Sequence, residues 1–210
     1  MSRSQYFDQM KSLAREIRTR YGLESPRVLK SDLRRIYKDQ GIKIDLWPHK
    51  LRTLRGAYFN DEFGATVMLA KDLPDDPMIF TMGHELKHHL VDSAAPLAFC
   101  DKTNESKEIE IGAEIFAAEL IYPEHDFITD MQKMGVKMAA CKPEILVRLK
   151  HATKTTLSYA GLSKRAEFLG FAAPNSLQSY NAWKKLEESI FGVPLYKQLL
   201  ARKRAQSTAS

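Results

Sequence analysis

Two histidines that flank a glutamate carry the strongest chemical signal in this sequence. The segment from Gly83 to His89 reads Gly-His-Glu-Leu-Lys-His-His, which contains the pattern His-Glu-x-x-His. On a helix, His84 and His88 lie one turn apart on one face, so both imidazoles can bind a single ion at about 2.0–2.1 Å. Glu85 then lies beside a zinc-activated water and can take its proton as the water attacks a carbonyl. The pattern predicts a metal site with a general base for hydrolysis.

A catalytic zinc needs a third protein ligand, and the next acidic segment offers several glutamates. The candidates are Glu105, Glu108, Glu110 and Glu114. Glu110 heads a helical stripe that continues through Ala113 and Ala117, and such small residues let two helices approach closely. We therefore predict Glu110 as the third ligand, and Glu114 as an acceptor that orients a liganding histidine. Two histidines and one carboxylate favour zinc, with manganese as the alternative.

The hydrophobic periodicity predicts the elements that position these residues. Spacings of three and four predict helices up to Gly22, around residues 31–40, over about 75–91 and over about 108–121. A period of two predicts short strands at residues 42–46, 56–60 and 65–69. We expect an α+β fold with a small antiparallel sheet packed on helices. We also expect the strand at 65–69 to be an edge strand, against which an extended peptide could pair.

Charge divides the 210 residues into three blocks. Residues 1–50 carry a net charge of +6, residues 51–130 carry −10 and residues 131–210 carry +10. We expect a metal-binding core at residues 1–130, followed by a basic helical region at residues 131–210. Basic surfaces often meet nucleic acid, so the two flanks could bind DNA or an acidic protein.

The cysteine count and the apolar runs predict the cellular compartment of the protein. Two cysteines are too few for a disulfide framework, which favours a reducing compartment. No apolar run approaches the roughly 20 residues that span a bilayer, and the first residues carry frequent charges. We expect a cytoplasmic protein without a membrane anchor.

The two predicted helices that carry the site resemble the ImmA/IrrE family of metallopeptidases. The similarity lies in the segment Phe80 to His89 and in the second helix up to Pro123, through Glu110, Ala113, Phe116, Ala117, Ala118 and Leu120. It extends more loosely over residues 5–170. Three positions depart from the usual family pattern, namely Lys87 for glycine, Glu114 for asparagine or aspartate and Tyr122 for methionine.

The resemblance implies a minimal zincin-like core followed by a helical, helix-turn-helix-like C-terminal part. It implies zinc ligands at His84, His88 and Glu110, with Glu85 as the general base. It also implies a zinc endopeptidase that cuts a protein partner, namely a helix-turn-helix repressor of mobile-element or stress-response genes. The alternative is a regulatory or immunity-type binding module, in which the metal is structural and Glu85 is dispensable.

The other residues with side chains suited to metal binding or catalysis have no single assignment from the sequence. His89 follows His88 by about 100 degrees around the helix, so we expect it not to reach the same ion. An oxyanion donor beyond the metal could be any of Tyr122, His125, His151 and Tyr159. The sequence does not choose among them, and it does not predict the oligomeric state.

Overall fold

The computed structural model describes residues 2–48, 55–93 and 104–208, and it begins with two helices. They are α1 (Arg3–Tyr21) and α2 (Lys30–Asp39). The Ser2 hydroxyl accepts a hydrogen bond from the backbone of Gln5 at the start of α1. Gly22 ends the helix with φ at +65°, a left-handed conformation that glycine adopts without strain.

Three strands form one sheet: β1 (Lys43–Trp47), β2 (Gly56–Asp61) and β3 (Gly64–Ala70). Their order is β1-β3-β2, with β2 antiparallel to β3 and β1 parallel to it. The predicted antiparallel sheet is therefore wrong in one pairing. Consecutive strands β1 and β2 do run in opposite directions, but β3 lies between them and so pairs in parallel with β1.

The strand order also corrects the predicted edge strand. The segment 65–69 belongs to β3, which is the central strand of the sheet, so its backbone is paired on both sides. Val67 and Leu69 are buried there. A nearly unbroken apolar strand is typical of a central position. Among the described strands, β2 and β1 are the edges.

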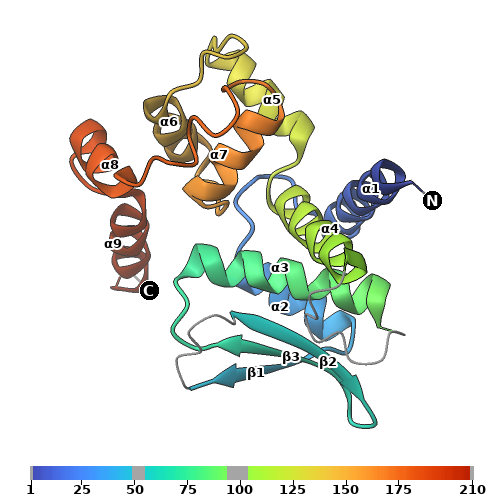
Figure 1. The fold of residues 1–210 in the computed structure, drawn as a ribbon. Coiled ribbons are helices and arrows are strands. Elements are labelled where there is room, and N and C mark those ends of the chain that lie inside the picture. The colour runs from blue at the N-terminus through green and yellow to red at the C-terminus, as the bar shows by residue number, and fades with distance from the viewer. Residues whose placement is uncertain (1, 49–54, 94–103, 209–210) are drawn as a thin grey trace. The chain divides into compact units, whose positions relative to one another are not determined.

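Two long helices carry the candidate chemistry, α3 (Asp75–Asp92) and α4 (Asn104–Ile121). α3 contacts β2 and β3 across one face of the sheet, and α2 lies beside it (Figure 1). The Tyr37 hydroxyl of α2 donates a hydrogen bond to the carbonyl of Met82 at 2.7 Å, which ties α2 to α3. α4 packs on α3 and against α1. The predicted α+β class is confirmed, with α3 between the sheet and α4.

A buried arginine fixes the end of α4. Arg18 of α1 donates hydrogen bonds to the carbonyls of Leu120 and Ile121, at 2.8 and 3.3 Å. These carbonyls belong to the last turn of α4 and have no partner within the helix. A guanidinium presents five donors in a fixed plane, so one side chain can cap two carbonyls.

The chain separates into two compact units, residues 1–123 and residues 124–210. The second unit contains five helices among the described residues. They are α5 (Glu124–Lys133), α6 (Pro143–Thr153), α7 (Tyr159–Phe168), α8 (Trp183–Phe191) and α9 (Leu195–Thr208). The predicted helical C-terminal part is confirmed by these helices. No helix in the described part of the chain has the length and apolar character needed to cross a membrane.

Candidate metal centre

The two helices that carry the site approach closely because small residues face each other. A Cβ on Gly83 of α3 would lie 3.3 Å from the Cβ of Ala117 and 3.4 Å from its Cα on α4. Ala113 and Ala117 are fully buried. The prediction that these alanines allow close helix packing is confirmed. The next residue after Gly83 is His84, so this approach sets its distance from α4.

Three metal-binding side chains converge between α3 and α4. The Nε2 atom of His84 lies 3.1 Å from the Oε2 atom of Glu110. The Nε2 atom of His88 lies 3.3 Å from that of His84 and 3.5 Å from the Oε1 atom of Glu110. Among the residues that the structure describes, these three form the group that could hold a metal ion.

The separation of the two imidazole nitrogens fits a tetrahedral ion. Ligands that each lie about 2.0–2.1 Å from a tetrahedral centre are about 3.3–3.4 Å apart. The two imidazole nitrogens are 3.3 Å apart, which matches that value. One carboxylate oxygen of Glu110 lies 3.1 Å from His84 and the other lies 3.5 Å from His88, so Glu110 can offer an oxygen to the same ion. Two imidazoles and a carboxylate would occupy three corners of such a site and leave the fourth for water or a substrate.

The carboxylates around His84 make the site attractive to a cation. Burial lowers the pKa of His84, but its hydrogen bond with Glu110 and the charges of Glu85, Glu110 and Glu114 outweigh that effect and raise the pKa. The field that attracts a proton to this ring also attracts a metal ion.

Glu85 lies beside this group, between α3 and the sheet. Its side chain is buried, and burial raises its pKa, while the nearby His84 and His88 and a hydrogen bond from the Tyr58 backbone act in the opposite direction. A Cβ on Gly56 of β2 would lie 3.1 Å from the Oε1 atom of Glu85. The strand β2 therefore touches the carboxylate that the sequence predicts as the base.

Contacts outside the three donors show residues that sequence reasoning missed. The Oδ2 atom of Asp92 lies 2.7 Å from the Nδ1 atom of His88, on the ring edge that faces away from Glu110. Asp92 follows His88 by one helical turn, so the spacing on α3 was a signal that could have identified it. Tyr58 offered no signal of this kind, because its proximity to Glu85 depends on how β2 packs against α3.

The other predicted residues are placed as follows. His89 is not part of the group, as predicted, and its Nδ1 atom lies 3.1 Å from the hydroxyl of Tyr58. Glu114 is exposed and acts on His84 through its charge, so its proposed orienting role remains a prediction. Tyr122 is fully buried, whereas the His125 side chain is 89% exposed. Glu105 lies where the structure describes the backbone alone.

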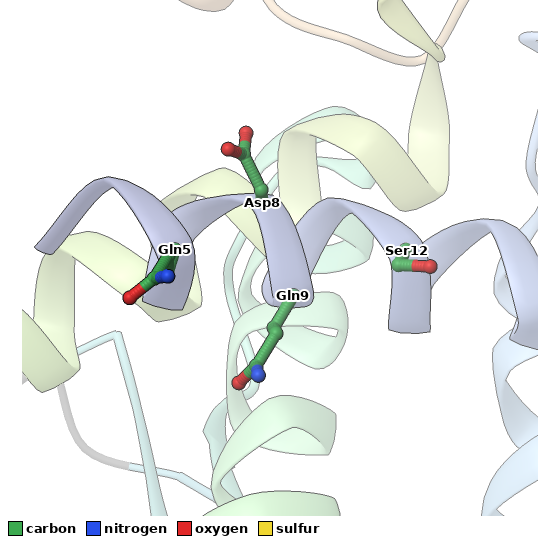
Figure 2. Close-up of a pocket in the computed structure, with 4 residues that line it drawn as sticks. All are labelled: Gln5, Asp8, Gln9 and Ser12. Atoms are coloured by element: carbon green, nitrogen blue, oxygen red, sulfur yellow. The ribbon is translucent and has the colours of Figure 1, made fainter. Parts of the chain in front are cut away.

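A surface hollow lies elsewhere on the first unit. It is lined by Gln5, Asp8, Gln9 and Ser12, whose side chains project from α1 (Figure 2). These residues include one carboxylate and neither histidine nor cysteine, so they lack the donors of a zinc site.

Comparison with known protein families gives a match to this chain. A family model described as the IrrE N-terminal-like domain, which defines a peptidase family, matches residues 37–164. A comparison with proteins of curated function finds no match. The matched segment covers more than half of the chain and includes β1 to β3, α3 and α4. The chain therefore belongs to the IrrE N-terminal-like, or ImmA/IrrE, family of peptidases.

Proposed function

We propose that this protein is a zinc-dependent endopeptidase. The observation that carries the proposal is the convergence of the donor atoms of His84, His88 and Glu110 on one point, with a buried glutamate beside them. Membership of a peptidase family supports hydrolysis of a peptide bond. Zinc suits two imidazoles and one carboxylate, and manganese is the second choice.

Each residue then has a distinct task. His84, His88 and Glu110 would hold the ion, which when bound lowers the pKa of water and polarises a carbonyl. Glu85 accepts a proton from the attacking water and returns it to the leaving amine. Its buried position supports this role, because burial brings the pKa of a carboxylate closer to the working pH.

The substrate is an extended segment of a protein, and β2 is where it would lie. β2 is an edge strand of the sheet and touches Glu85, so a peptide paired with it would pass the base. By kinship with the family, we propose a helix-turn-helix repressor in the cytoplasm as the partner. The basic block at residues 131–210 supports a further contact with DNA to which such a repressor is bound.

The test replaces Glu85 by glutamine, which keeps the size of the side chain and removes the base. Zinc-loaded wild-type and Glu85→Gln proteins are incubated with a lysate of the host, and new protein N-termini are labelled and identified. Glu108→Gln is the matched control, because the Glu108 side chain on α4 is 49% exposed and pairs with Arg3.

We expect new N-termini in a helix-turn-helix protein with the wild type and with Glu108→Gln. We expect Glu85→Gln to retain its zinc and to lose about 10²–10⁴-fold in rate. New N-termini in another class of protein would retain the peptidase and replace its substrate. Equal cleavage by Glu85→Gln would contradict the role of this residue. The absence of any zinc-dependent cleavage would favour the metal-stabilised binding module.

A further inference from the structure

A buried lysine and an aspartate lie directly behind the proposed metal ligands. One carboxylate oxygen of Asp92 makes two short polar contacts. Its Oδ2 atom lies 2.7 Å from the Nδ1 atom of His88 and 2.7 Å from the Nζ atom of Lys87. The Asp92 side chain is 10% exposed and that of Lys87 has no exposed surface. An ionised carboxylate can only accept, so a hydrogen bond between these two atoms requires the proton of the imidazole to lie on Nδ1. The Nε2 atom, which faces His84 and Glu110, then presents its lone pair.

Lys87 extends this network to the second helix. Its Nζ atom lies 3.2 Å from the carbonyl oxygen of Ile109, the residue immediately before Glu110. It also lies 5.6 Å from the centre of the Tyr6 ring, a cation–π distance. Tyr6 itself packs tightly on α4, because a Cβ on Gly112 would lie 2.6 Å from its hydroxyl oxygen. The ammonium therefore joins α3, the first part of α4 and α1 at one buried point.

We propose that Asp92 and Lys87 are positioning residues for the metal site. Asp92 fixes the orientation and the proton of His88, and Lys87 holds both Asp92 and the backbone that carries Glu110. The inference rests on the proposed metal site, and it extends the site beyond the three ligands. The competing explanation is that Lys87 and Asp92 are an ordinary buried ion pair, which stabilises the packing of α3 on α4 and has no effect on the metal.

The test measures metal binding and stability separately in the full-length chain. The variants are Asp92→Asn and Lys87→Met, which preserve the approximate size of each side chain. The control is Arg15→Met, because Arg15 and the buried Glu119 form an ion pair of 2.9 Å between α1 and α4 that involves no proposed ligand. The readouts are the zinc dissociation constant from chelator competition, the absorption spectrum of the Co²⁺-substituted protein, and the Tm without metal.

We expect Asp92→Asn to weaken zinc binding by about 10–100-fold and to change the cobalt spectrum. We expect Lys87→Met to act in the same direction, and Arg15→Met to lower the Tm while leaving the zinc affinity and the spectrum unchanged. An unchanged affinity and spectrum in Asp92→Asn would overturn the proposal, however large the loss of Tm.

A measurement on the unmodified chain guards against a variant that fails to fold. Nitrogen NMR of the metal-free wild type is expected to show the His88 proton on Nδ1, and a proton on Nε2 alone would overturn the proposal. Failure of the wild type to bind zinc at all would overturn the metal site together with this inference. Zinc binding that depends on Asp92, in a protein without peptidase activity, would support this inference and remove only the proposed function.

Discussion

At the scale of single residues, Gly56 determines where the Glu85 carboxylate can lie. A Cβ at this position would lie 2.5 Å from the Cγ2 atom of Thr81 and 3.1 Å from the Oε1 atom of Glu85. We expect Gly56→Ala to displace both side chains, to destabilise the protein by about 1–3 kcal/mol and to reduce hydrolysis without removing zinc. Chemical denaturation and a zinc assay check this prediction. The control is Ala57→Ser, which changes the opposite face of the same strand, and equal behaviour of the two variants would contradict it.

Candidate site residues that lie one or two helical turns apart could be predicted from the sequence. Those whose contacts come from distant segments could not. His84, Glu85 and His88 follow from one helical turn, and Glu110 follows from the stripe that contains Ala113 and Ala117. Asp92 was within reach of the same reasoning. Lys87 was not, because its partners include the carbonyl of Ile109 and the ring of Tyr6, which other helices supply. No periodicity in the sequence identifies such a contact.

At the scale of elements, the separation of α3 and α4 controls the site. Gly83→Ala would place a methyl group 3.3 Å from the Cβ of Ala117, and alanine also favours a helix by about 1 kcal/mol. We expect the packing effect to dominate at the site, because the methyl group would push α4 and Glu110 away from His84. The zinc dissociation constant should increase. Ala117→Gly should restore part of the affinity in the double variant, and unchanged zinc binding by Gly83→Ala alone would contradict the prediction.

The contact between α6 and α8 should depend on pH. His151 of α6 stacks on Phe191 of α8, with ring centres 3.6 Å apart, and its Nε2 atom lies 3.6 Å from the Oε1 atom of Glu187. Burial lowers the pKa of His151 from 6.5, although the charge of Glu187 acts in the opposite direction. Below about pH 6.5 the unfolded chain takes up the proton first, so the unfolded state gains stability as the pH falls. The contribution of His151 to the free energy of unfolding is therefore fully present above about pH 6.5.

We therefore expect the free energy of unfolding to fall from about pH 6.5 down to the lower pKa of the folded state. The contribution of His151 has a slope of at most about 1.4 kcal/mol per pH unit. Urea titrations of the wild type and of His151→Phe at several pH values isolate this contribution, because the other histidines are common to both. A difference between the two proteins that does not vary with pH would contradict the prediction.

The sheet shows what a strand pattern can and cannot predict. The period of two located β1, β2 and β3 to within a few residues, but it carries no information on which strand is central. The apolar run of β3 was the available signal for a central strand. Pairing of β1 with β3 depends on packing between segments distant in sequence, which residue periodicity does not encode.

At the scale of the whole molecule, the most basic block and the candidate metal group lie in different parts of the sequence. The candidate metal group belongs to residues 1–123, whereas residues 131–210 carry a net charge of +10. We expect the full chain to bind a random-sequence DNA duplex at 50 mM salt, and to lose at least about tenfold in affinity by 200 mM because counterion release drives such binding. Fluorescence anisotropy of a labelled duplex measures this affinity. The Glu85→Gln variant should bind equally well, and the absence of binding at 50 mM salt would contradict the prediction.

The central claim is tested most directly by metal content. Elemental analysis is carried out on protein purified without a metal-affinity tag, for the wild type, Glu110→Ala and Glu108→Ala. The account predicts about one zinc per chain in the wild type and in Glu108→Ala, and a large loss in Glu110→Ala. A well-folded wild-type protein that takes up no metal under any loading condition would contradict the account.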